Sequence, residues 1–369
     1  MNGIYIHIPF CKRKCNYCDF CSYAEADYTH EEYAKRVCEE SDNFKDENIC
    51  ADTVYFGGGT PTLLDEKYIE SILVSLKDNF HISSDAEITI EANPCTVTKE
   101  KMKNLHSVGF NRVSLGVQSF SDTVLKTLGR LHSSDDVKRS AEKIRNAGFS
   151  NLNIDLMYAV PGQSFEDLST SLSEVLKISP EHISAYGLKI EEGTPFYSMV
   201  RKGEISEMSD DDYADMYEQI CKTLTNHGYN QYELSNFSKK GMESKHNLKY
   251  WQGEDYIGLG AAASSRIGLK RYTRSPNLSR YMKSFSNDEE IILTRRDAMS
   301  EYMFMGLRLT SLGVSKAAFK QKFSVECYDV FTDAIDKHTK NGLLKDLGDR
   351  YILANEAFYI SNYVLCDFV

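Results

Sequence analysis

Short apolar runs alternate with amphipathic stretches along the first half of the chain. The runs predict strands, and the stretches with helical periodicity between them predict helices. Strands that alternate with helices form a parallel sheet with right-handed crossovers, which predicts an α/β fold. Because six such units are present, we expect a partial (β/α)6 TIM-like barrel over residues 1–190. The expected strands are Gly3–Ile8, Thr53–Phe56, Glu87–Glu91, Arg112–Val117, Asn151–Met157 and His182–Leu188, and the expected helices include Lys99–Val108, Asp122–Leu128, Asp136–Asn146 and Phe165–Lys177.

The pattern changes after residue 190, which predicts an extension over residues 191–311. The extension begins with a long helix at Asp211–Asn226 and includes the aromatic segment Lys245–Trp251. Residues 312–369 predict a small, mainly helical domain that ends with a hairpin at Gly342–Leu353. The order helix, helix, hairpin is typical of a winged helix. Since this domain has slightly more acidic than basic residues, we expect a lid or a partner-docking module rather than a nucleic-acid binder.

Polar residues or a glycine turn stand at the ends of the second to sixth predicted strands. The turn Gly57–Pro61 follows the second strand, Glu91 ends the third, Gln118 follows the fourth, and Asp155 and Tyr186 lie near the ends of the fifth and sixth. Any one of them could be an ordinary turn or capping residue. In barrel folds, however, the site is built at the carboxyl ends of the strands, so together these residues predict one cavity.

Composition narrows the classes of function. The net charge of −11 disfavours binding of nucleic acids over a broad surface. The expected first strand begins at Gly3, and the chain holds no apolar run of membrane-spanning length, so we expect neither a signal peptide nor an integral membrane protein. Its ten cysteines, scattered apart from one N-terminal group, fit a reducing compartment, and we expect a cytoplasmic protein.

That group is Cys11, Cys15 and Cys18, spaced C-x3-C-x2-C directly after the first strand. Thiolates this close together converge on a single soft metal centre. Three of them leave one iron of a [4Fe-4S] cube without a protein ligand. Two alternatives stay open at this point, namely a closed four-cysteine zinc site that includes Cys21 and plain structural thiols.

The cysteine spacing together with Tyr55-Phe-Gly-Gly-Gly-Thr-Pro61 resembles the radical S-adenosylmethionine (SAM) superfamily. The resemblance implies that SAM chelates the open iron through its amino and carboxylate groups. It also implies that reduction of the cluster can cleave the sulfonium of SAM and release a 5′-deoxyadenosyl radical. The cofactor does this chemistry, while the protein supplies position and shelter.

Further segments resemble the oxygen-independent coproporphyrinogen oxidase family and its heme-chaperone relatives. They are Asn111–Phe120, Leu128–His132, Asp155–Gln163 and His182–Tyr186. Arg130 suits the carboxylate of SAM, although a cation after a helix end could also compensate the helix dipole. The resemblance implies that SAM is held by Tyr5, Gly59, Thr60, Glu91, Gln118, Arg130 and Asp155, with Tyr17 as a neighbour of the adenine.

Two functions share this family pattern, an oxidase and a heme chaperone, and three features favour the chaperone. Phe20 stands where the oxidases have a fourth cysteine, so Cys21 is expected to be a plain loop thiol. The cysteine motif also begins close to the N-terminus, whereas the oxidases carry a longer extension. The third feature is His246-Asn-Leu-Lys-Tyr-Trp251, which matches the H-N-x-x-Y-W signature of the chaperones.

This signature is chemically suited to heme. A neutral imidazole such as that of His246 can ligate iron, and Tyr250 and Trp251 offer flat apolar faces to a macrocycle. The alternative is that His246 holds a loop by hydrogen bonds while Trp251 anchors the extension to the barrel. One departure from the relatives stands at Ser264, where they often have a histidine.

We therefore expect a protein with one [4Fe-4S] cluster on Cys11, Cys15 and Cys18 that binds SAM and heme and passes heme to an acceptor protein. The cluster would need an electron donor. The alternative is an oxygen-independent coproporphyrinogen III oxidase, which decarboxylates two propionates of the porphyrinogen to vinyl groups. The sequence assigns no catalytic residue and leaves open whether SAM is cleaved.

Overall fold

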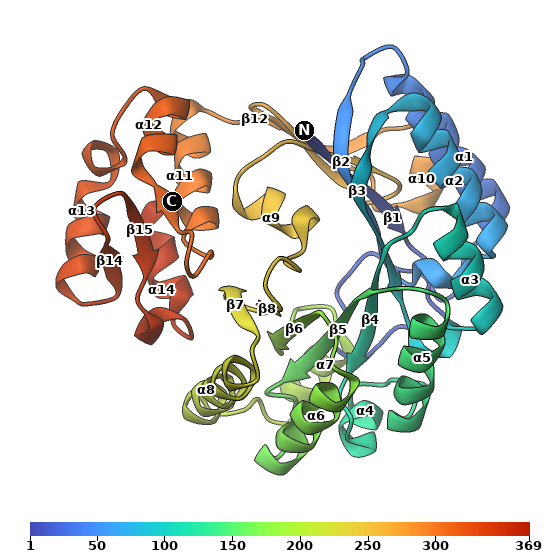
Figure 1. Cartoon of the computed structure of the whole chain (residues 1–369), viewed down its shortest axis with the longest axis horizontal. Coiled ribbons are helices and arrows are strands. Elements are labelled where there is room, and N and C mark those ends of the chain that lie inside the picture. Colours follow the sequence, from blue (N-terminus) through green and yellow to red (C-terminus); the bar gives the residue numbers. More distant parts are fainter.

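The computed structural model describes residues 1–369 and is built on one 12-stranded sheet (Figure 1). Its centre is the predicted parallel array, in which neighbours along the chain are neighbours in the sheet. The strands are β1 (Asn2–Ile8), β2 (Cys50–Gly58), β3 (His81–Ala92), β4 (Arg112–Gln118), β5 (Asn151–Tyr158) and β6 (His182–Gly187), and the crossover helices are α1 (His30–Ser41), α2 (Glu66–Asn79), α3 (Lys99–Val108), α4 (Asp122–Thr127), α5 (Ser134–Asn146) and α6 (Phe165–Ile178).

Side chains alternate along these strands between an apolar outer face and a polar inner face. In β1, Ile4, Ile6 and Ile8 are fully buried in the main core. The same core takes Val113, Leu115 and Val117 of β4 and Leu152, Ile154 and Leu156 of β5. The residues between them therefore face the interior of the partial barrel, and most of these interior residues are polar. The partial (β/α)6 barrel predicted from the sequence is confirmed, with its polar residues gathered inside.

The extension after residue 190 lengthens the sheet at both ends. Beside β1 lie β9 (Tyr256–Leu259), which is parallel to it, and then the antiparallel strands β10 (Ser264–Ile267), β11 (Lys270–Arg274) and β12 (Asn287–Ile292). At the other end, β6 pairs with β8 (Asn236–Ser238), which pairs with β7 (Asn230–Glu233). The helices of the extension are α7 (Pro195–Arg201), α8 (Asp210–Asn226), α9 (Lys245–Trp251) and α10 (Leu278–Lys283).

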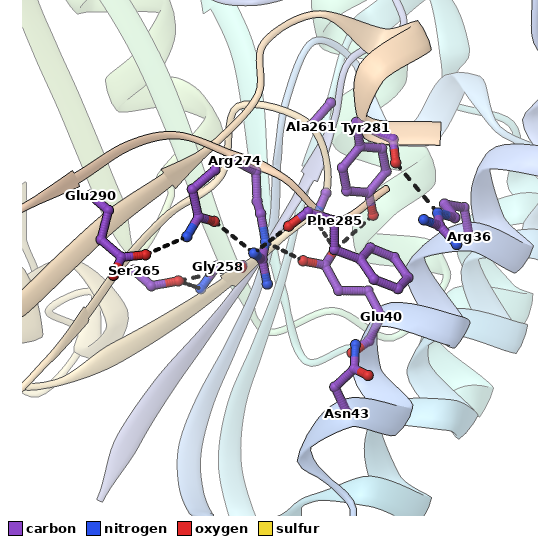
Figure 2. Close-up of polar contacts among 12 residues, drawn as sticks. Arg36, Glu40, Asn43, Gly258, Ala261, Ser265, Arg274, Tyr281, Phe285 and Glu290 are labelled. Atoms are coloured by element: carbon purple, nitrogen blue, oxygen red, sulfur yellow. Dashed lines mark hydrogen bonds and ion pairs between the residues drawn. The ribbon is translucent and has the colours of Figure 1, made fainter. Parts of the chain in front are cut away.

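A buried ion pair joins the added strands to α1 (Figure 2). Glu40 is fully buried, and its Oε1 accepts a hydrogen bond of 2.6 Å from Nε of Arg274 in β11. Its Oε2 accepts from the Tyr281 hydroxyl at 2.7 Å and from the Gly260 N–H at 2.9 Å. Nearby, Ser264 shares a hydrogen bond of 2.9 Å with Thr273 across β10 and β11. One carboxylate thus fixes three separate segments of the extension.

The C-terminal region has a three-stranded sheet and a core of 19 buried residues, one of which, Leu234, comes from the extension. The predicted hairpin is present, but β13 adds a third strand and α14 follows the hairpin. The core also includes residues of α11, which lies before the boundary expected at residue 312. No helix is both long enough and apolar enough to span a bilayer. The elements are α11 (Arg295–Gly306), β13 (Val314–Ser315), α12 (Lys316–Phe323), α13 (Cys327–Lys340), β14 (Leu344–Asp346), β15 (Arg350–Leu353) and α14 (Ser361–Leu365).

Candidate functional site

A cavity of about 430 Å³ lies at the carboxyl ends of the barrel strands. Its wall combines the loop after β1, the turn after β2 and the ends of β3 to β6. Residues predicted from six separate segments meet there, because the carboxyl ends of parallel strands share one edge of a sheet. The predicted residues that line it are Cys11, Cys15, Tyr17, Cys18, Gly59, Thr60, Glu91, Gln118, Arg130, Asp155 and Tyr186.

The loop that carries the three cysteines is fixed to the barrel by main-chain hydrogen bonds. Its two ends are joined by the Cys11 N–H, which donates to the Tyr23 carbonyl at 2.9 Å, and by the Tyr23 N–H, which donates to Pro9 at 2.7 Å. Its middle is held by Asn16, whose N–H donates to the Leu128 carbonyl at 3.0 Å. Three main-chain hydrogen bonds therefore fix the course of the loop.

The three thiols share the cavity wall with polar neighbours. Nη1 of Arg130 lies 3.5 Å from Sγ of Cys15, and Oγ1 of Thr60 lies 3.8 Å from Sγ of Cys11. Burial raises the pKa of the Cys18 thiol. No three Cys, His, Asp or Glu side chains lie close enough together to enclose a single metal ion. The cavity does hold three thiols and no fourth, which is the set of protein ligands that an open-iron [4Fe-4S] cluster requires.

Cys21 lies outside this cavity. Its Sγ donates to the carbonyl of Pro276 at 3.4 Å. The structure therefore does not assemble a four-cysteine zinc site from this loop.

The glycine turn after β2 is seated directly against the cysteine loop. The N–H of Gly59 donates to Ile8 at 2.8 Å, and that of Thr60 donates to Phe10 at 2.8 Å. A Cβ on Gly59 would lie 2.6 Å from the carbonyl oxygen of Phe10. Gly58 has a φ of +110°, which favours glycine, and a Cβ there would lie 2.7 Å from the ring of His7. Glycine is thus required here to pack the two loops together.

Two carboxylates, Glu91 and Asp155, face the cavity with their oxygens already hydrogen-bonded. Glu91 accepts from the Tyr55 hydroxyl at 2.9 Å and from the Gly58 N–H at 3.2 Å. Burial and the nearby Asp155 raise the pKa of Glu91 to about 7. Burial also raises the pKa of Asp155, which accepts from Asn153 and Ser114. A cavity with two acidic groups in partly desolvated positions is suited to a ligand that carries positive charge and hydroxyl donors.

The chain is similar over its whole length to proteins named heme chaperone HemW. It is 36% identical over 371 residues to that of Lactococcus lactis subsp. lactis, which covers 100% of this chain and 97% of the relative. It is 33% identical over 374 residues to that of Escherichia coli, covering 98% and 97%. The Radical SAM superfamily matches residues 5–175, and the HemN C-terminal domain matches residues 293–360.

The chain belongs to the HemW family of radical SAM proteins. Its fold is also that of a solved structure titled coproporphyrinogen III oxidase (HemN) from Escherichia coli. The TM-score is 0.85 at 22% identity, and the match covers 99% of this chain and 89% of that chain. At this level of identity the likeness concerns the fold alone.

Tyr5 is the one residue of the predicted SAM set that does not line the cavity in this member of the HemW family. Its hydroxyl donates to Nδ1 of His7 at 3.0 Å, and Nε2 of His7 donates to the carbonyl of Cys21 at 2.9 Å. The Tyr5 ring also stacks on Tyr55, with 6.2 Å between ring centroids. Tyr5 therefore supports the cysteine loop and the cavity wall from behind.

The HemW signature residues of α9 also lie away from the cavity. The His246 ring is 1% exposed, and both of its nitrogens are hydrogen-bonded, Nδ1 to Thr53 at 2.9 Å and Nε2 to Tyr250 at 2.8 Å. Burial lowers the pKa of His246 to about 3. The guanidinium carbon of Arg308 lies 4.5 Å from the centroid of the Trp251 ring. The heme roles expected for His246, Tyr250 and Trp251 stay predictions.

Sequence reasoning missed the polar residues of the barrel interior. Arg112, Asn153 and His182 are each at most 2% exposed, and none was named as part of the site. Their signal was present in the sequence, because each lies on the same strand face as a cavity residue two or four positions further along the strand. Arg112 lies two positions before Ser114 in β4, Asn153 two before Asp155 in β5, and His182 four before Tyr186 in β6.

Proposed function

We propose that this protein is a heme chaperone that holds a [4Fe-4S] cluster on Cys11, Cys15 and Cys18, binds SAM in the cavity, and passes heme to an acceptor protein. The observation that carries the proposal is the shared cavity. Three thiols without a fourth line one wall, and seven residues of the predicted SAM set line the others. Full-length similarity to proteins named heme chaperone HemW supports the heme function.

The side chains around the cavity differ in charge and in hydrogen-bonding capacity, and each kind suits a different group of SAM. Arg130 is the cation suited to the SAM carboxylate, whereas Glu91 and Asp155 are acceptors suited to its ammonium, sulfonium and ribose hydroxyls. Gln118 can both donate and accept, which suits a polar edge of ribose or adenine. When bound, the cluster and SAM together supply one-electron reduction of a sulfonium. An electron donor for the cluster and a heme acceptor are the protein partners that this function requires.

The heme site is proposed separately from the SAM cavity. The sequence nominates His246, Tyr250 and Trp251 of α9. For His246 to ligate iron, its ring would have to give up Thr53 or Tyr250 as a hydrogen-bond partner. The test is therefore made directly on heme binding, as described below for a His246 variant.

The cluster assignment is tested by replacing the three cysteines. After anaerobic reconstitution, a variant with alanine at Cys11, Cys15 and Cys18 should lose the broad visible absorption of the cluster and retain no bound iron. Cys21→Ala is the matched control, because that thiol belongs to the same loop but lies outside the cavity. An unchanged spectrum in the triple variant would refute the assignment.

The chaperone function is tested against the oxidase alternative in one experiment. Cluster-loaded protein is incubated anaerobically with SAM, reductant and coproporphyrinogen III, and a known oxidase is run in parallel. We expect no vinyl-bearing product from this protein. In a second reaction, heme-loaded protein should transfer heme to an apo heme protein. Vinyl-bearing product formed over many turnovers would show that the protein is an oxidase.

A further inference from the structure

Helix α9, which carries the HemW signature, is connected through the barrel interior to both carboxylates of the cavity. In Figure 1 the helix lies between the barrel and the C-terminal domain. Two buried paths start from it, one ending at Asp155 and one at Glu91. Each path is made of direct contacts between neighbouring residues, and neither passes through solvent.

The path to Asp155 is a chain of hydrogen bonds. The N–H of Ser244, the N-cap of α9, donates to the Tyr232 hydroxyl at 3.3 Å. Tyr232 is 2.7 Å from Nε2 of His182, and Nδ1 of His182 is 2.6 Å from Oδ1 of Asn153. Nδ2 of Asn153 then donates to Oδ1 of Asp155 at 2.7 Å.

The direction of every donor in this chain is fixed. Oδ1 of Asn153 can only accept, so Nδ1 of His182 carries the proton. Burial lowers the pKa of His182 well below its usual value, so the ring is neutral and Nε2 is an acceptor. The Tyr232 hydroxyl must therefore donate to it. All donors from α9 onward therefore point toward the carboxylate of Asp155. Bonds aligned in one direction polarise each other, so the chain holds Asp155 oriented as an acceptor. Ser114 donates to the second oxygen of Asp155 at 3.1 Å.

The path to Glu91 runs through stacked rings. The His246 ring lies 5.2 Å from that of Tyr55, with an angle of 27° between their planes. The Tyr55 hydroxyl donates to Oε1 of Glu91 at 2.9 Å. His246 is itself fixed by Thr53, by Tyr250 and by its main-chain N–H, which donates to Glu87 at 3.1 Å. The ring is thus held rigidly beneath the residue that orients Glu91.

We propose that α9 forms the floor of the barrel and positions Glu91 and Asp155 for the cationic ligand of the cavity. His182, Tyr232 and His246 are then positioning residues that act through Asn153 and Tyr55. This inference rests on the proposed function, in which that ligand is SAM. It assigns His246 a different role from the iron ligand predicted by the sequence, and the two roles lead to opposite experimental results.

The Asp155 path is tested with Tyr232→Phe and His182→Phe in cluster-loaded protein. We expect SAM affinity, measured by isothermal titration calorimetry, to fall roughly tenfold in His182→Phe and by less in Tyr232→Phe. Tyr229→Phe is the matched control. The Tyr229 hydroxyl is also buried and hydrogen-bonded, to Pro180 at 2.7 Å, but it lies outside the path. This control should keep the wild-type affinity.

A double-mutant cycle separates positioning from general destabilisation. If His182 acts through Asp155, then His182→Phe should cost little further affinity once Asp155→Asn is present. Additive losses would overturn the inference. Affinity that is unchanged in all path variants would also overturn it and would leave the proposed function intact. Wild-type protein that binds no SAM would refute the proposed function and this inference together.

The Glu91 path is tested with His246→Phe, and with Tyr250→Phe as the milder change. We expect SAM affinity to fall severalfold in His246→Phe while the Soret band of the heme-bound protein keeps its position and the heme affinity is unchanged. A lost or shifted Soret band with unchanged SAM affinity would overturn the positioning role and establish His246 as a heme ligand. Cluster absorbance and thermal unfolding show whether each variant is folded.

Discussion

The titration of Glu91 predicts how SAM affinity depends on pH. The pKa of Glu91 is raised to about 7, because the carboxyl is largely removed from water and lies near Asp155. A bound cation favours the ionised carboxylate, so protonation of Glu91 competes with SAM binding. Roughly one-tenth of Glu91 is ionised at about pH 6 and roughly nine-tenths at about pH 8, so affinity should rise roughly tenfold between them.

The assay compares wild-type protein with Glu91→Gln across this range, with SAM affinity measured calorimetrically on cluster-loaded protein. SAM has titratable groups of its own, which affect both proteins equally, so the informative quantity is the ratio of the two affinities. This ratio should rise by about tenfold through pH 7. A ratio that stays constant with pH would show that Glu91 does not titrate against the ligand and would refute the reasoning.

Three further predictions concern the scaffold. Glu40→Ala removes the carboxylate partner of Arg274, whose side chain is only 12% exposed, and should cost about 3–5 kcal/mol in urea unfolding, whereas loss of the exposed Lys35 pair should cost less than ~1 kcal/mol. Gly59→Ala should lower cluster content after reconstitution, because its Cβ meets Phe10 at 2.6 Å, and an unchanged iron content would contradict this packing. Arg308→Ala should alter the fluorescence of the chain's one tryptophan, and unaltered emission would deny the contact.

The barrel was predictable from the sequence because each of its central strands has one fully apolar face. Helix Lys99–Val108 was predicted to the residue, since a threonine cap precedes it and a glycine follows. The strands of the extension were not predicted. They are three to six residues long, and β12 (Asn287–Ile292) has no buried side chain, so no alternation marks it as a strand.

The cavity was predictable for a similar reason. Once the strands are parallel, their carboxyl ends meet, and Glu91, Gln118 and Asp155 need no long-range information to be placed together. The surroundings of His246 could not be predicted from the strand order. Its partners Thr53 and Tyr55 lie far away along the chain, and the local motif is the same whether the ring binds iron or packs under a tyrosine.

The fixed path of the cysteine loop bears on how the protein would survive damage. Its ties at Tyr23 and Leu128 are all made by main-chain atoms, so none depends on iron or sulfide. A chain whose cluster has been destroyed by oxygen should therefore keep its shape and remain ready to be reloaded. In that case the rate of cluster repair would set how long the protein stays functional in a cell, and one folded polypeptide could receive several clusters in succession.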